Sequence, residues 1–184
     1  MPPEDAAPGP RAAAGSRNPG PAGPSGAPAP HTEAELDTLL GLVPRCASVV
    51  LGHGRDAAST AAALAFAARW RAGGGTVLDV VDWPEEAASW LRQARRFTAH
   101  APDAWVVAAG PRGWAGMSRR LRRSTDWAPE RSFGFASAGG APARAAAGPG
   151  VLDGMRGATP GGGTWQVGDG GRPGHRTPPA AAAR

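Results

Sequence analysis

The chain has 184 residues, a length that suits one domain with tails, and 20 arginines against 15 acidic residues give it a net charge of +5. Lysine is absent, which excludes a Walker A phosphate site and a Schiff-base site for pyridoxal phosphate. The single cysteine, Cys46, excludes an internal disulfide and any zinc site with two or more thiolates.

The basic charge is weak evidence for a nucleic-acid partner. Lysine, tyrosine and isoleucine, which have A/T-rich codons, are all absent, so the composition indicates a GC-rich bacterial genome. We therefore expect no nucleic-acid partner. No apolar run is long enough to span a membrane, and residues 1–16 contain no hydrophobic signal core. The chain as written is predicted to be cytoplasmic.

The two ends of the chain are rich in proline, glycine and alanine and poor in large apolar residues. Residues 1–31 cannot bury enough surface to order themselves and are predicted to be a disordered tail. Residues 139–184 are predicted to be mostly disordered as well, with one short strand at 163–167. The folded unit is therefore predicted at 32–138, within the usual size of a single domain.

The folded unit begins with a helix. Thr32 and Glu35 have the spacing of a capping box, and Pro44 ends the helix that they start. Residues 47–51 are apolar throughout, as expected for a strand covered on both faces. This strand stops at Gly52, where a glycine turn leads into an alanine-rich segment.

The alanine-rich segment predicts a helix over 57–71, with Asp56 as its N-cap and the glycines at 73–75 as its end. A second strand is predicted at 76–81. The next helix is predicted to open at 82–86, because a proline suits a first helical turn and two glutamates complement the helix dipole there.

A third strand is predicted at 104–109, with its exit loop at 110–113. The helix that follows turns its large apolar residues inward and its arginines outward. The inward residues are Trp114, Met117 and Leu121, and the outward ones are Arg119, Arg120, Arg122 and Arg123. A weaker fourth strand is predicted at 131–137. The order β-α-β-α-β-α-β predicts a three-layer α/β fold, αβα, with a small parallel sheet.

Three strand exits should lie side by side at one edge of this sheet, where open parallel sheets bind ligands. They are Gly52–Asp56, Asp82–Trp83 and Gly110–Arg112. Arginine can hold a carboxylate, tryptophan can pack an apolar body, and helix starts add positive potential, so the mixture suits a small zwitterionic or anionic solute. The candidate ligand-binding residues are Gly52, His53, Gly54, Arg55, Asp82, Trp83, Gly110 and Arg112. The alternative is that these are turn residues near solvent, with Asp56 only capping a helix.

The sequence predicts no catalytic residue and no metal site. His53 is the one plausible general base, but no serine or cysteine is placed as a nucleophile beside it, so an exposed loop histidine is expected. His31, His100 and His175 form no metal-ligand spacing with it. No cofactor is therefore expected.

Two alternatives to a simple solute-binding domain stay open. Gly52-x-Gly54-x-x-Ala57 matches a relaxed dinucleotide fingerprint and, with Asp82 ending the second strand, allows a Rossmann-like nucleotide-dependent enzyme. Asp56 would place a negative charge beside the pyrophosphate, which weighs against that enzyme. A partner-binding scaffold is the other alternative. The arginine run at 119–123 is interpreted as a solvated face, with a phosphate-binding patch as its alternative.

The order of several segments resembles a known family. Three segments have counterparts in that family. They are a glycine run followed by a strand at 73–77, Trp83-Pro84 after the second strand, and Pro102-Asp103-Ala104 before the third. The layout is similar to the second lobe of type I periplasmic binding proteins, the amino-acid (Leu/Ile/Val-type) substrate-binding components of ABC transporters. The resemblance covers about Val43 to Ser137, and residues 157–167 are similar to a late strand region of that lobe.

This resemblance implies a non-enzymatic lobe that binds a small, amino-acid-like solute. It also implies an ABC transporter membrane component as partner and an extracytoplasmic location. The first lobe of such proteins has no counterpart in the chain, and the loop reads GHGRD where an acidic, tyrosine- or glycine-bearing loop is frequent.

Overall fold

The computed structural model describes residues 28–44 and 48–168 and places a six-stranded sheet at their centre. The strands are β1 (Ser48–Gly54), β2 (Thr76–Trp83), β3 (Ala104–Ala108), β4 (Ser132–Gly134), β5 (Arg156–Ala158) and β6 (Thr164–Gln166). They lie in the order β2-β1-β3-β4-β5-β6, and all neighbours are parallel except β5 and β6. The predicted parallel α/β fold is confirmed, with β5 and β6 added to the four strands of the predicted sheet.

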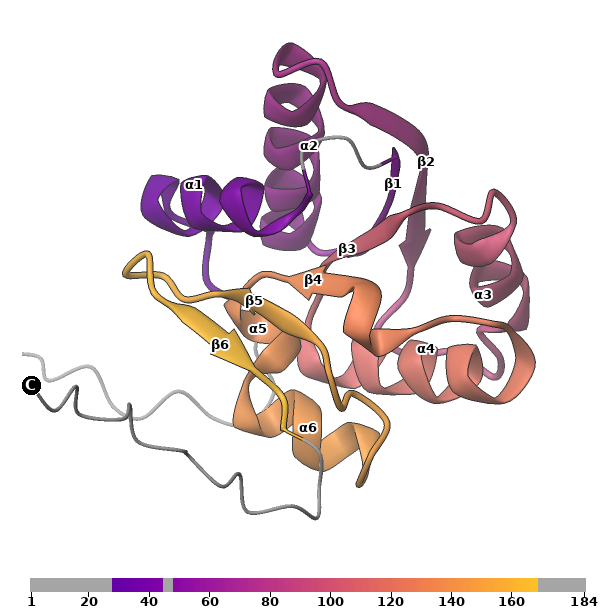
Figure 1. Cartoon of the computed structure of the whole chain (residues 1–184). Coiled ribbons are helices and arrows are strands. Elements are labelled where there is room, and N and C mark those ends of the chain that lie inside the picture. The colour runs from indigo at the N-terminus through magenta and orange to yellow at the C-terminus, as the bar shows by residue number, and fades with distance from the viewer. Residues whose placement is uncertain (1–27, 45–47, 169–184) are drawn as a thin grey trace, which may run out of the picture.

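Helices cover both faces of the sheet, as Figure 1 shows. They are α1 (Glu33–Leu42), α2 (Ala57–Ala72), α3 (Leu91–Thr98), α4 (Pro111–Ser124), α5 (Ala136–Gly139) and α6 (Ala141–Ala147), with a 3-10 turn η1 (Pro129–Arg131). Helices α1 and α2 pack on one face, and α3 to α6 share the apolar cluster on the other. The three layers are those predicted. In the ranges that the structure describes, no helix combines the length and apolar character needed to cross a bilayer.

The apolar runs in the central strands contribute side chains to two apolar clusters, one on each face of the sheet. Val49, Leu51 and Val106 face α1 and α2, whereas Val50 and Val107 face the opposite layer. All five are buried. Because successive side chains of a strand point to opposite faces, a continuous apolar run is what a strand between two helical layers requires.

Aromatic side chains fill the layer of α3 and α4. Trp83 stacks on Trp114, with ring centroids 5.9 Å apart, and meets the edge of Phe97 at 6.0 Å. Trp114 in turn meets the edge of Trp127 at 5.7 Å. Such contacts stabilise the fold beyond the burial of large apolar surfaces. The packed rings of Trp83, Phe97, Trp114 and Trp127, which we call the column, therefore tie β2 to α4.

Both predicted helix caps are present. The Oδ1 atom of Asp56 accepts the N–H of Ser59 at 2.8 Å, and the Oγ1 atom of Thr32 accepts the N–H of Glu35 at 3.0 Å. Glu35 does not complete the capping box. Its Oε1 atom instead accepts the N–H of Ala136 at 2.6 Å, which joins α1 to the start of α5.

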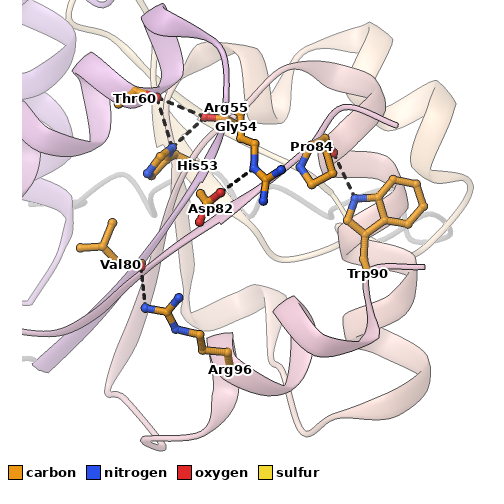
Figure 2. Close-up of polar contacts among 9 residues, drawn as sticks. All are labelled: His53, Gly54, Arg55, Thr60, Val80, Asp82, Pro84, Trp90 and Arg96. Atoms are coloured by element: carbon orange, nitrogen blue, oxygen red, sulfur yellow. Dashed lines mark hydrogen bonds and ion pairs between the residues drawn. The ribbon is translucent and has the colours of Figure 1, made fainter. Parts of the chain in front are cut away.

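The helix predicted to open at 82–86 begins only at Leu91, so that prediction is wrong. Strand β2 continues to Trp83, and an irregular segment follows it. In that segment, Trp90 Nε1 donates to the carbonyl oxygen of Pro84 at 3.2 Å, as Figure 2 shows. Contacts made by individual side chains therefore replace the helical turn that proline and two glutamates suggested.

Two further predictions are corrected near β3 and β4. The predicted exit loop at 110–113 is the first turn of α4, with Gly110 as N-cap and Pro111 as first residue, a position that proline favours. The predicted fourth strand is shorter and ends at Gly134. It stops there because a helical turn starts at Ala136, where Glu35 accepts its N–H.

The boundary predicted at Ala138 lies too early. Helix α6 and strands β5 and β6 all fall in the segment that was predicted to be mostly disordered. Ala143, Ala147 and Met155 are buried in the same cluster as Trp114, so these elements complete the core. The short strand predicted at 163–167 matches β6. The predicted tails over residues 1–27 and 169–184 lie outside the described residues, as do Cys46 and His175.

Candidate functional site

The three predicted strand exits meet at one edge of the sheet. Strands β2, β1 and β3 are neighbours and run parallel, so their carboxyl ends lie together. Helices α2 and α4 both begin at this edge. We call this edge the rim and define it as residues 52–60, 82–86 and 108–113.

His53 is buried at the rim, with 9 % of its surface exposed, and is not the exposed loop histidine that was expected. Its Nδ1 atom lies 2.7 Å from the carbonyl oxygen of Gly54 and 3.5 Å from Thr60 Oγ1 (Figure 2). Because a carbonyl oxygen can only accept, Nδ1 carries the proton in the shorter contact. The ring is thus held by the last residue of β1 and the first turn of α2.

The charged side chains of the rim form ion pairs. Arg55 Nε lies 2.6 Å from Asp82 Oδ2, and both side chains are about half exposed (Figure 2). The hydrogen bond from Arg55 lowers the pKa of the Asp82 carboxyl. Arg112 is more loosely held, since its Nη1 atom lies 3.9 Å from Glu86 Oε1 and 61 % of the side chain is exposed. Arg112 therefore remains the more available guanidinium.

Gly52 and Trp83 are rim residues that lie below its surface. Trp83 is fully buried among Phe97 and Trp114, so it offers no face to a solute. A Cβ atom at Gly52 would lie 2.5 Å from the Trp83 ring, which shows how closely the ring covers the strand. We assign both residues to the core that supports the site.

Three oxygen atoms without a hydrogen-bond partner among the described residues surround Gly54. They are Asp56 Oδ2, Ser59 Oγ and Glu85 Oε1, and all three are buried. A Cβ atom built on Gly54 would lie 2.8 Å from the first, 3.4 Å from the second and 3.5 Å from the third. The absence of a side chain at Gly54 thus lets these three oxygen atoms approach the end of β1 closely.

Besides Ser59, the residue of this group that the sequence prediction missed is Glu85. Its Oε2 atom accepts the N–H of Gly113 at 2.7 Å, so the carboxylate lies at the positive end of α4. A Cβ atom at Gly110 would lie 2.4 Å from Glu85 Oε1, so a larger residue there would displace the Glu85 carboxylate. The available signal in the sequence was a glutamate just after the end of β2, together with Gly110 and Gly113 at the start of α4.

The rim has the chemistry of a binding site. Buried acceptors that have no partner cost free energy, so such groups in a protein call for an explanation, and a hydrogen-bond donor from a ligand is one. Within residues 28–44 and 48–168, no group of three or more His, Cys, Asp or Glu side chains is placed to hold a metal ion.

The comparisons with known proteins concern structure. No protein-family model and no curated protein matches the sequence. A type 1 periplasmic binding protein from Bordetella pertussis Tohama I matches 68% of this chain at 20% identity and a TM-score of 0.59. A putative branched-chain amino acid ABC transporter from Rhodospirillum rubrum matches 68% at 18% identity and 0.55. A solute-binding protein of an R. palustris ABC transporter, in complex with benzoate, matches 68% at 18% identity and 0.52.

These matches confirm, at the level of fold, the resemblance to type I periplasmic binding proteins. The chain spans about a third of the length of each of them, 33%, 36% and 33% respectively. The part that matches is therefore a partial domain with the architecture of one lobe.

Proposed function

We propose that this chain is a solute-binding lobe of the kind found in ABC transporter substrate-binding proteins, and that it binds an amino-acid-like solute without catalysis. The observation that carries the proposal is the group of three unpartnered oxygens around Gly54, at the sheet edge where parallel α/β folds bind ligands. The solved structures with this fold are solute-binding or ABC transporter proteins by description, which supports the same class. The membrane component of such a transporter is the proposed partner.

A primary ammonium group suits the three acceptors. It carries three N–H donors, and Asp56, Ser59 and Glu85 offer one free oxygen each, two of them on carboxylates. Arg112, which is exposed and only loosely paired, can hold the carboxylate at the other end of the solute. Together they suit a zwitterion better than an anion alone.

A dinucleotide is the less favoured ligand. Asp56 caps α2, and Glu85 accepts an N–H in the first turn of α4, so carboxylates already occupy both helix starts at the rim. A pyrophosphate would meet these two negative charges instead of free N–H groups. If NADH quenched the tryptophan fluorescence of the chain and an amino acid did not, the enzyme alternative would replace the proposal.

The test is a thermal-shift screen, in which the melting temperature of the chain is measured with each amino acid added at millimolar concentration. A bound amino acid raises the melting temperature by mass action, and the matched carboxylic acid without the ammonium group should not. Glu85→Gln should abolish most of the shift, because it removes a charge from the acceptor group. Glu33→Gln, which changes a side chain on α1 that is 81% exposed and lies outside the rim, is the matched control. No shift with any amino acid, or equal shifts for both variants, would contradict the proposal.

A further inference from the structure

The arginines of the helices are concentrated on one helical layer of the molecule. Helices α3 and α4 carry three and five arginines and no acidic residue. Helix α1, on the opposite face of the sheet, carries Glu33, Glu35 and Asp37 and no basic residue. Helix α2, beside α1, carries Arg69 and Arg71. The contrast between the layers is therefore that α3 and α4 hold eight arginines without any acidic residue.

Four of the eight arginines have other contacts. Arg96 is paired with Asp79, and Arg112 belongs to the rim. Arg119 and Arg122 donate hydrogen bonds to backbone carbonyl oxygens on and after α6. The remaining four form what we call the arginine face: Arg92, Arg95, Arg120 and Arg123.

The arginine face consists of side chains without an ion-pair partner among the described residues, on two helices of one layer. Arg92, Arg95 and Arg123 are exposed and Arg120 is half-buried, and within the described ranges no hydrogen bond or ion pair involves any of them. Helices α3 and α4 lie on the same side of the sheet (Figure 1) and share one apolar cluster beneath. Arg95 and Ser124 line one hollow of about 350 Å³, so the last turns of both helices open on the same surface.

We propose that the arginine face docks on the anionic surface of a phospholipid bilayer. The two helices turn their apolar residues into the core, so binding would be electrostatic and peripheral, without insertion. Among the described residues, the large apolar side chains that are exposed are Leu64 and Leu78, so the face offers no aromatic ring for stacking on nucleic-acid bases. Guanidinium groups spread over two adjacent helices match a flat array of lipid phosphates.

The test is co-sedimentation of the full chain with vesicles of phosphatidylcholine alone or with added phosphatidylglycerol. We expect binding only to the vesicles with phosphatidylglycerol, and its loss at roughly 0.5 M salt. Each arginine near the membrane surface contributes enough that Arg123→Gln should weaken binding about fivefold. Arg71→Gln is the matched control, since it removes one exposed arginine from α2, on the other layer.

Three outcomes would overturn the proposal. They are the absence of binding to vesicles with phosphatidylglycerol at low salt, an equal loss for Arg71→Gln and Arg123→Gln, and displacement from the vesicles by duplex DNA at matched phosphate concentration. The second would show that net charge alone is responsible, and the third that the face prefers a nucleic acid. Unfolding curves that match the wild type for both variants ensure that the comparison concerns folded chains.

Discussion

Asp79 on β2 and Arg96 on α3 are joined by two hydrogen bonds, Nε to Oδ2 at 2.7 Å and Nη2 to Oδ1 at 2.6 Å. The same pair satisfies the backbone of Val80, since Asp79 Oδ1 accepts its N–H at 2.7 Å. Arg96 Nη2 donates to the carbonyl oxygen of Val80 at 3.2 Å, as Figure 2 shows. Strand β2 is an edge of the sheet. The pair therefore occupies backbone groups to which another strand could add.

Asp79→Asn should destabilise the chain in a pH-dependent way. The hydrogen bond from Arg96 holds the pKa of Asp79 below its usual value, so this carboxylate stabilises the fold above the unfolded-state pKa of about 3.9. The stabilisation is lost as the pH falls through the lower, folded-state pKa. We expect a loss of about 1 kcal/mol at neutral pH for this partly exposed pair, measured by urea unfolding. The difference from wild type should shrink below about pH 4.

Asp126→Asn is the control for that experiment, because Asp126 is an exposed aspartate that makes no recorded pair within the described residues. Its unfolding free energy should match the wild type at all pH values. Equal losses in the two variants, or a loss in Asp79→Asn that does not change with pH, would contradict the role assigned to the pair.

Gly52→Ala should destabilise the supporting core beneath the rim. An added methyl group would lie 2.5 Å from the Trp83 ring and 2.6 Å from Phe97, so the stacked aromatic residues would have to move. Overpacking of this kind costs about 1–3 kcal/mol in the free energy of unfolding. Gly41→Ala is the matched control, since nothing lies within 4 Å of the new methyl group on α1. It should stabilise by about 0.5–1 kcal/mol. A neutral Gly52→Ala would show that the column is looser than described.

The succession of strands and helices along the chain and their three-layer arrangement could be predicted, because both depend on local patterns. Each of these patterns acts within a few residues of the chain. They are the apolar run after Cys46, the capping residues Thr32 and Asp56, and the alanine-rich helical spacing. The rim followed from topology, since parallel neighbouring strands end at one edge. Such patterns carry no information about which side chains then become buried there.

The missed features depend on contacts between distant residues. Glu85 is at the rim because Gly113 donates to it from another element, and Trp83 is in the core because Trp114 packs on it. From the sequence, the first resembled a helix-start glutamate and the second a ligand-facing aromatic residue. Strand β5, which the sequence analysis missed, is only three residues long, too short to show a period.

Glu35→Ala should weaken the link between α1 and the start of α5. Glu35 is 3% exposed, and its carboxylate accepts the N–H of Ala136 at 2.6 Å, across 101 positions of the sequence. Removing the acceptor leaves a partly buried N–H without a partner, which costs about 1–3 kcal/mol. Glu35→Gln keeps an acceptor and should lose less. Glu33→Ala, at a side chain that is 81% exposed, should change little. Hydrogen exchange at the Ala136 amide separates a local effect from a global one, because in Glu35→Ala this amide should exchange faster than the amides of β1.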